Sequence, residues 1–271
     1  MKKIKYMLGA CCLALSLTSC SDFLNEEPVS EIPAGEMWKT ARDAKAGVNE
    51  IYGLLRSTLR ENYFYWGEFR SDNVAPGAPV MADQARVINN LMSTDERSAR
   101  WTTLYQLINQ ANLAIKYVPG ISMPDVADRN DYLGQAYAMR ALAYFYAIRV
   151  WGDVPLFVEP TEKYSKDIYK VRTNRATILE DVIIPDLKKA ETLIHRNKNF
   201  ERKRISICGV WAIMADVYMW TGQYNLADQT IDKMADISSS KGRFVDFEPS
   251  IQAWHTMLTE ELNNKPSDDT P

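Results

Sequence analysis

The sequence has few of the residues from which catalytic and metal sites are built. Its only two histidines, His195 and His255, are too few and too far apart in the sequence to suggest a metal site. Neither lies near a serine or cysteine nucleophile motif, and no glycine-rich phosphate-binding loop is present. The acidic residues are scattered along helix-like segments, where a solvated face is their usual place. We therefore expect no enzyme, no metal and no cofactor.

Long hydrophobic runs are also lacking. The apolar run near the N-terminus, residues 6–17, has 12 residues, whereas a membrane-spanning helix needs about 20. It follows a lysine-rich start and leads into the lipobox Leu17-Thr18-Ser19-Cys20. We expect residues 1–19 to be a lipoprotein signal peptide and Cys20 to be acylated at the new N-terminus. The alternative is an ordinary signal peptide followed by a chance cysteine.

A basic excess is missing as well. The whole chain has a formal net charge of −3, and removing 19 residues with three lysines leaves 252 residues at −6. Nucleic acids and anionic membrane surfaces select basic stripes or patches. We therefore expect no nucleic-acid partner and no polybasic membrane patch.

Cysteine is scarce in the part of the chain expected to fold. Cys11 and Cys12 lie in the signal peptide and Cys20 is the lipid acceptor, so only Cys208 remains. One thiol cannot form an intramolecular disulfide, so the fold must be held by packing. Cys208 lies in an apolar run, which favours a buried, inert thiol over a nucleophile.

The remainder of the chain divides by composition. Residues 20–35 are acidic and polar and are expected to form a tether between the lipid and the folded body. Residues 36–237 carry apolar side chains at helical spacing and are expected to form one helical domain. Residues 238–271 lose this pattern and are expected to be a weakly structured tail.

Start and stop signals predict where the helices of this domain lie. Thr40 with Asp43 favours a helix start, and Ser206 favours another. Gly152 is expected to end a helix in the left-handed conformation, and Pro185 to restart a helix from its first turn. The expected helices cover residues 41–55, 104–118, 132–151, 177–194, 207–220 and 226–234.

Residues 60–100 differ from the rest of the domain. Residues 61–66 are dense in aromatic side chains, and residues 71–79 are turn-rich and cannot continue a helix. Long structured loops commonly carry function. We therefore expect a long irregular loop here, with functional contacts within it.

One pair of helices has a recognisable repeat pattern. A helix rich in alanine and aromatic residues, then Gly222-Gln223-Tyr224, then Ala227, matches the helix–turn–helix of a tetratricopeptide repeat. Two degenerate units end at Pro119 and at Trp151-Gly152. We predict an all-α, tetratricopeptide-like helical repeat scaffold with a long irregular loop.

Several motifs occur in a fixed order between Cys20 and about Asp236. They are Cys20-Ser-Asp-Phe-Leu24, Ser71-Asp72-Asn73, Leu104-Tyr105-Gln106 through Asn112, Gly134-Gln135 through Phe145, Trp151-Gly-Asp-Val-Pro-Leu156, Asp186-Leu187 through Ala190, and Arg204-Ile-Ser206 leading to Tyr218 and Gly222. In order and spacing they resemble the SusD/RagB family of outer-membrane nutrient-binding lipoproteins. The chain is similar to the N-terminal portion of such a protein, since family members usually carry a large further C-terminal region.

The resemblance implies a surface-exposed, lipid-anchored scaffold in the outer membrane of a Bacteroidetes-type bacterium. Such a protein captures oligosaccharides or polysaccharides for a TonB-dependent, SusC-like transporter. The alternative is a tetratricopeptide-type scaffold that binds only protein and has no glycan site of its own.

For the glycan that the resemblance implies, we expect contacts within residues 63–100. Sugar rings present apolar C–H faces to aromatic planes, and their hydroxyls need amide or carboxylate partners. Trp66 is the leading stacking candidate, with Asp72 and Asn73 as hydrogen-bonding partners at the rim. Core packing is an equally expected role for Trp66, and turn formation is the commoner role of Asp72 and Asn73.

Other polar and aromatic residues are expected to be structural. Arg140, among alanines and aromatics, is expected to form a bidentate bond to a carboxylate or to carbonyl groups rather than to meet a ligand. Trp101, Trp211 and Trp220 lie in or beside helical apolar runs and are expected in the core.

Overall fold

The computed structural model describes residues 37–163, 166–194 and 204–240. The signal peptide, Cys20, the tether and residues 241–271 of the expected tail lie outside the described residues. The long helices are α3 (Ala41–Trp66), α5 (Thr102–Tyr117), α6 (Val126–Trp151), α8 (Ile184–Leu193), α9 (Ile207–Trp220) and α10 (Tyr224–Ser240). Short helical elements are η1 (Glu68–Arg70), α4 (Ala82–Ile88), η2 (Arg97–Ala99), η3 (Val118–Gly120), η4 (Lys166–Ile168), α7 (Arg175–Ile178) and the π-helical turn η5 (Leu179–Ile183).

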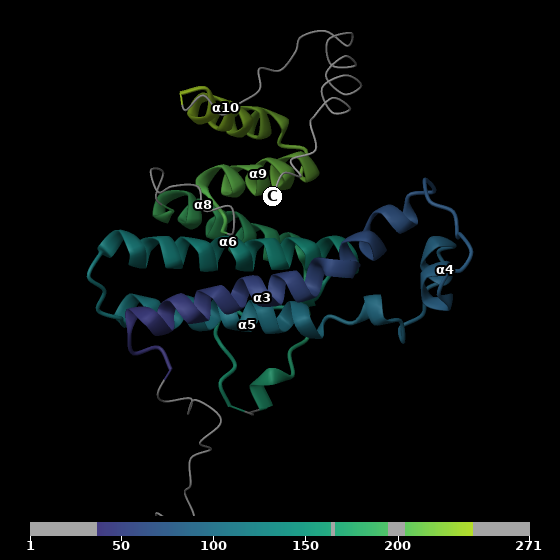
Figure 1. Ribbon diagram of the computed structural model, residues 1–271, viewed down its shortest axis with the longest axis horizontal. Coiled ribbons are helices and arrows are strands. Elements are labelled where there is room, and N and C mark those ends of the chain that lie inside the picture. Colours follow the sequence, from purple (N-terminus) through teal and green to yellow (C-terminus); the bar gives the residue numbers. More distant parts are fainter. Residues whose placement is uncertain (1–36, 164–165, 195–203, 241–271) are drawn as a thin grey trace, which may run out of the picture.

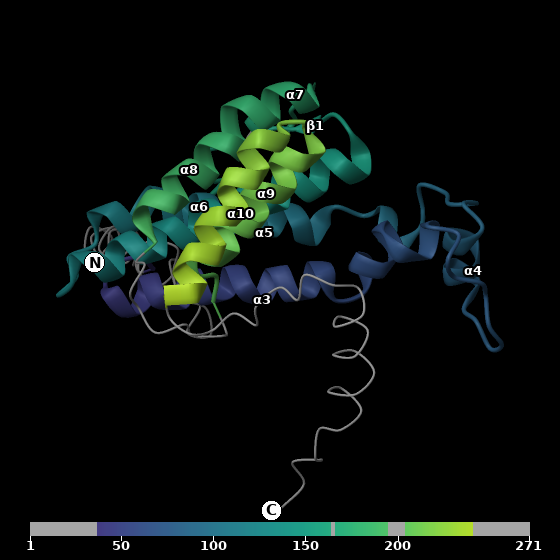
Figure 2. The same cartoon turned by 90° about the horizontal axis from the view of Figure 1, so that it is seen from above.

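The long helices form a layered stack. Figure 1 shows α3, α5 and α6 side by side, with α8, α9 and α10 stacked in turn over α6. Figure 2, from above, shows α4 and its flanking loops projecting beyond the C-terminal end of α3. Within the described residues, strand structure is limited to a two-residue antiparallel ladder between β1 (Val154–Pro155) and β2 (Arg172–Thr173). The all-α, tetratricopeptide-like class is thus confirmed.

The helix starts follow the signals in the sequence. Thr40 and Asp43 form a complete capping box at α3, and the Ser206 side chain accepts a hydrogen bond from the Gly209 N–H at α9. Pro185 lies in the first turn of α8, as expected, and the π-helical turn η5 leads directly into this helix.

Two glycines at helix ends have positive φ values, as expected for Gly152. Gly152 after α6 has φ of 73°, and Gly222 between α9 and α10 has φ of 74°. Side chains disfavour this conformation, so glycine is suited to both positions.

Two boundaries differ from those expected. α6 begins at Val126, earlier than expected, because Asp125 caps it by accepting from the Ala127 N–H. α3 continues through the aromatic residues to Trp66, because Tyr65 is buried and Trp66 packs on Tyr146 of α6. The irregular stretch therefore begins at Gly67 rather than at residue 60, and it contains the helix α4.

The outer helix pair also differs from the prediction. Trp220, expected in the core, is 41% exposed at the end of α9, and on α10 Leu226 and Ile231 are exposed. α10 packs on α9 through Ala227 and Thr230 instead, and it continues to Ser240. The small side chain of Ala227 allows α9 and α10 to approach closely, and the larger apolar side chains of Trp220, Leu226 and Ile231 lie outside this contact.

The core lies around α6, whose alanines between Ala136 and Ala147 are fully buried against its neighbours. Arg140 on α6 forms the expected bidentate bond, with Nε and Nη2 at 2.7 and 2.9 Å from the two carboxylate oxygens of Asp186 on α8. Its Nη1 also donates to Oδ1 of Asn112 on α5 at 2.7 Å. This buried ion pair joins three helices, which confirms a structural role for Arg140.

Candidate functional site

Six aromatic side chains form a continuous row of ring contacts, which we name the aromatic row. In contact order it consists of Tyr146, Trp66, Trp151, Trp101, Tyr105 and Phe157, with neighbouring ring centroids 5.2–6.0 Å apart. It begins at Tyr146 on α6, passes Trp66 at the C-terminal end of α3, Trp151 at the end of α6 and the start of α5, and finishes in the segment after β1. Edge-to-face and tilted contacts of this kind fix the rings relative to one another.

The segment after β1, residues 155–161, is held against α5 and α6 by side-chain hydrogen bonds to its backbone. The Asn112 side chain donates to the Phe157 carbonyl at 2.9 Å, and the Tyr144 hydroxyl both donates to that carbonyl and accepts from the Phe157 N–H. Arg140 donates to the Val158 carbonyl at 3.1 Å. The motif residues on α5 and α6 therefore position residues 155–161, which we name the return segment.

The return segment, α3 and α5 enclose a groove of about 920 Å³, which we name the aromatic groove. Its lining residues are Glu50, Leu54, Trp101, Thr102, Tyr105, Gln106, Ile108, Asn109, Gln110, Pro155, Phe157, Thr161 and Ile168. Three members of the aromatic row thus form its apolar wall, and amide side chains of α5 lie beside them. Ligand grooves commonly combine apolar walls with a few placed polar groups.

Several polar groups of the groove are engaged in holding it together. The Tyr105 hydroxyl donates to the Pro155 carbonyl at 2.6 Å, and the Asn109 side chain exchanges two hydrogen bonds with the Thr161 backbone. Burial raises the pKa of Tyr105, so this hydroxyl stays protonated as a donor near neutral pH. Gln106 and Glu50 also line the groove, are exposed and form no hydrogen bond within the described parts of the chain.

The sequence-predicted residues lie at the other end of the aromatic row or outside it. Trp66 is partly buried, packs on Tyr146 and Trp151, and donates its indole N–H to the Ser98 carbonyl at 2.8 Å. It does not appear among the described residues that line the aromatic groove. Its surroundings agree with the core-packing role that was the equal alternative.

Asp72 and Asn73 are exposed on the loop after η1. Asp72 has a left-handed φ of 63°, and the turn is bonded by Ser71, whose hydroxyl donates to the Glu68 carbonyl and accepts from the Asn73 N–H. Within the described residues, no hydrogen bond links Trp66 to Asp72 or Asn73. None of the three residues is among those that line the aromatic groove.

The groove residues Trp101, Tyr105, Gln106 and Glu50 were missed as site candidates. Trp101 directly follows the long loop and precedes a helix, and Tyr105 and Gln106 follow within its first turns. Aromatic residues at positions i and i+4 at the start of a helix lie on one face, which is a signal that the sequence does contain. The wall supplied by the return segment had no comparable local signal.

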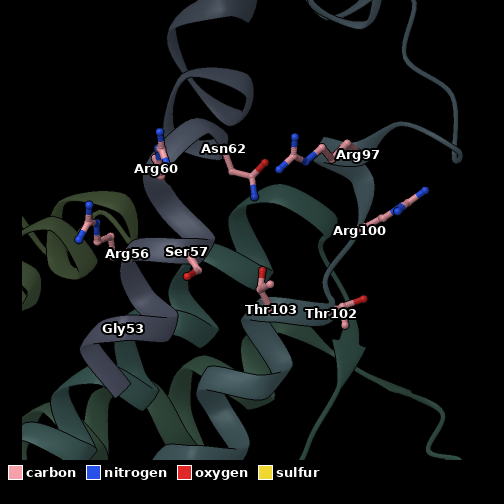
Figure 3. A pocket seen from close by; sticks show the side chains of 9 residues that line it. All are labelled: Gly53, Arg56, Ser57, Arg60, Asn62, Arg97, Arg100, Thr102 and Thr103. Carbon is pink, nitrogen blue, oxygen red and sulfur yellow. The ribbon is translucent and has the colours of Figure 1, made fainter. Parts of the chain in front are cut away.

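A second cavity adjoins the aromatic groove and shares Thr102 with it. It has a volume of about 730 Å³, and we name it the arginine pocket. Its lining residues are Gly53, Arg56, Ser57, Arg60, Asn62, Arg97, Arg100, Thr102 and Thr103. In Figure 3, Arg56 and Arg60 extend from α3 on one side, and Arg97 and Arg100 from the segment before α5 on the other.

Two further properties of the described residues bear on the kind of site. They contain no cluster of three or more histidine, cysteine, aspartate and glutamate side chains placed to hold a metal ion. Among the helices of the described ranges, none has both the length and the apolar character needed to span a membrane. Cys208 is partly buried against the core.

Comparison with curated proteins identifies similar chains. The sequence is 35% identical over 242 residues to SusD-like protein P38 of Formosa agariphila, covering 86% of this chain and 46% of that protein. It is 26% identical to SusD-like protein P2 of the same organism, covering 92% of this chain and 49% of that protein. The chain therefore spans about half the length of these curated relatives.

Solved structures share the fold. NanU of B. fragilis superposes with a TM-score of 0.66 at 25% identity, covering 79% of this chain and 44% of that one. A laminarin-binding SusD-like protein superposes with a TM-score of 0.62 at 22% identity, covering 72% of this chain and 43% of that one.

The SusD-like family model, described as "Starch-binding associating with outer membrane", matches residues 22–219, which include every helix of the described fold up to α9. That description is one of binding rather than catalysis, in agreement with the expectation of no enzyme. The helical scaffold, the ordered motifs and this match together show that the chain belongs to the SusD-like family.

Proposed function

We propose that this protein binds oligosaccharides at the cell surface and delivers them to a TonB-dependent, SusC-like transporter of the outer membrane. The observation that carries the proposal is the aromatic groove, with Trp101, Tyr105 and Phe157 along its wall. The starch-binding description of the family and the laminarin-binding relative support the same class of ligand.

In this proposal the apolar face of a sugar ring packs on the exposed part of Trp101. Gln106 and Glu50 then supply the amide and carboxylate partners that sugar hydroxyls require, because neither is engaged within the described residues. The rigid row of rings behind Trp101 holds its indole in place before the ligand arrives, which reduces the entropy lost on binding.

Direct stacking of a sugar on Trp66, with Asp72 and Asn73 at the rim, stays a prediction, and we place the aromatic groove before it. Trp66 does not line the aromatic groove, and its indole N–H is already satisfied by the Ser98 carbonyl. Tyr63 and Phe64, which are 54% and 48% exposed, are the more accessible rings of that region.

Isothermal titration of the purified protein with a panel of soluble glycans tests the proposal. Saturable binding of at least one glycan, by protein whose circular dichroism is helical, is the expected result. Binding of none would favour the alternative function as a protein-binding scaffold.

That alternative has its own observation. Met219, Trp220, Tyr224, Leu226 and Ile231 leave a largely apolar surface exposed along α9 and α10. Exposed apolar patches commonly mark protein contacts. In the main proposal this helical surface, rather than a charged one, is available for the transporter, and recovery of a TonB-dependent barrel on purification from outer membranes is the expected result.

Lipid attachment at Cys20 is the proposed anchor, with the folded body facing the cell exterior. Changing Cys20 to alanine removes the acylated thiol, so the precursor should remain unprocessed or the protein should leave the membrane fraction. Fractionation followed by mass spectrometry of the N-terminus measures both. A Cys208→Ala variant is the matched control and should stay anchored, and unchanged processing of Cys20→Ala would contradict the proposal.

A further inference from the structure

The arginine pocket concentrates positive charge in a chain that is acidic overall. Among the described residues that line it, four are arginines and none is acidic. Arg56, Arg60 and Arg100 are exposed and form no ion pair or hydrogen bond with other described residues. In Figure 3 the Arg56 and Arg100 side chains point to opposite sides, and as long, exposed side chains they can turn towards an anion bound in the cavity and donate charge-assisted hydrogen bonds to it.

The pocket contains a second feature that favours an anion. Thr102 and Thr103 in its lining form the first turn of α5, a helix of 16 residues. That end has no side-chain cap and no acidic residue in its first turn, so its N–H groups and the positive end of the helix dipole remain available. The arginines and the start of α5 thus both favour an anion bound in the pocket.

Neutral hydrogen-bonding groups lie among these positive ones. Ser57 and Asn62 on α3, with the threonine hydroxyls of α5, also line the pocket. Sulfate and carboxylate oxygens each accept several hydrogen bonds, and the guanidinium fork of arginine matches both groups geometrically. An oxyanion joined to a hydroxyl-rich molecule fits this mixture.

The position of the pocket indicates the rest of that molecule. The arginine pocket and the aromatic groove meet at Thr102, which lines both. In addition, the Arg172 guanidinium lies 5.5 Å from the ring centroid of Trp101, and the Lys170 ammonium 4.7 Å from that of Phe157. Two further cations therefore lie beside rings of the groove wall.

We propose that the glycan recognised by this protein is acidic, with a carboxylate or sulfate group held in the arginine pocket while a neighbouring sugar ring packs in the aromatic groove. This inference rests on the proposed glycan-binding function and specifies the chemical class of its ligand. A neutral glycan would use the groove and leave the arginines without a partner.

Matched ligand pairs separate the effect of charge from that of the sugar backbone. A galacturonic acid oligosaccharide is compared with its methyl ester, and a sulfated galactan oligosaccharide with its desulfated form, by titration of the whole protein. We expect at least one acidic member to bind about tenfold more tightly than its neutral partner, because each charge-assisted hydrogen bond exceeds a neutral one. The pair that shows the preference identifies the anionic group as carboxylate or sulfate.

Substitution locates this preference in the pocket. Arg56→Gln together with Arg100→Gln should reduce it to about twofold or less, since both guanidiniums are lost while the groove is untouched. Arg42→Gln is the matched control: Arg42 is exposed on the same helix, about 20 Å along the axis from Arg56, and the variant should keep the full preference. Circular dichroism and thermal melting establish that each variant is folded.

Each outcome decides between the two proposals. Equal affinity for the acidic and neutral members of both pairs overturns this inference and leaves glycan binding intact. A preference that the double variant retains, or that Arg42→Gln loses equally, also overturns the assignment to the pocket. Binding of no glycan by folded protein overturns the proposed function and this inference with it.

Discussion

Changing Arg140 to methionine is expected to lower the free energy of unfolding by about 3–5 kcal/mol, because it leaves the Asp186 carboxylate buried without its cation. The two side chains are 7% and 3% exposed, and Arg140 also bonds Asn112 and the Val158 carbonyl. Methionine is apolar and retains the aliphatic stem of the side chain, so the loss reflects mainly the missing charge and hydrogen bonds. Urea unfolding followed by circular dichroism at 222 nm measures the effect.

The pH dependence of this variant gives a second readout. Burial already raises the pKa of Asp186, and the Arg140 guanidinium opposes that rise. Without Arg140 the pKa rises further, so the folded state binds the proton more tightly than the unfolded state does. The stability of the variant should therefore fall as the pH rises above about 4, the ordinary range of aspartate, and the deficit should be larger at pH 8 than at pH 5.

An exposed ion pair of the same kind provides the control. Arg149 on α6 pairs with Asp216 at 3.0 Å, and these side chains are 41% and 56% exposed. Arg149→Met should cost about 1 kcal/mol or less, because solvent screens the pair. Equal losses in the two variants would contradict the central role given to the buried pair.

Changing Trp101 to alanine is expected to weaken glycan binding about thirtyfold, or about 2 kcal/mol, because it removes the stacking surface from the groove wall. Tyr105 and Phe157 stay in place, since the hydrogen bonds of the return segment do not pass through the indole. Isothermal titration with the best ligand of the glycan panel measures the change in Kd.

Two further tryptophan variants make the result specific. Trp220→Ala removes an indole that is 41% exposed on α9, away from the groove residues, and it should leave the affinity unchanged. Trp66→Ala should lower the stability of the protein. It should also weaken glycan binding, but less than Trp101→Ala does, because Trp66 packs behind the groove on Trp151 and does not line it. A larger loss of glycan affinity in Trp66→Ala than in Trp101→Ala would instead place the binding site within residues 63–100.

The features predicted correctly from the sequence are those that local chemistry determines. The capping box of Thr40, the start at Ser206, the first-turn position of Pro185 and the positive φ of Gly152 each depend on a residue and its near neighbours. The structural role of Arg140 was predictable as well, since an arginine among alanines needs an acceptor. Its partner was not, because Asp186 lies 46 residues further along the chain.

The features predicted wrongly depend on contacts distant in sequence. Residues 61–66 read as the start of a loop, but the packing of Trp66 on Tyr146 extends α3 through them. Trp220 read as core, yet α10 packs on α9 through the small Ala227 and leaves the indole partly exposed.

The candidate site was only partly predictable for the same reason. An aromatic surface beside the long loop was expected, and Trp101 lies directly at its end. The groove exists, however, because the return segment folds back on α5 through pairs such as Asn109 with Thr161, which are 52 residues apart. No pattern within either segment indicates that pairing.

A crystal structure of the protein with a bound oligosaccharide, the best ligand of the glycan panel, tests the central claim most directly. The account predicts a sugar ring on Trp101 within the aromatic groove, with hydroxyls hydrogen-bonded to Gln106 and Glu50. A ligand seated elsewhere, with the groove residues unchanged and free of sugar, would contradict it.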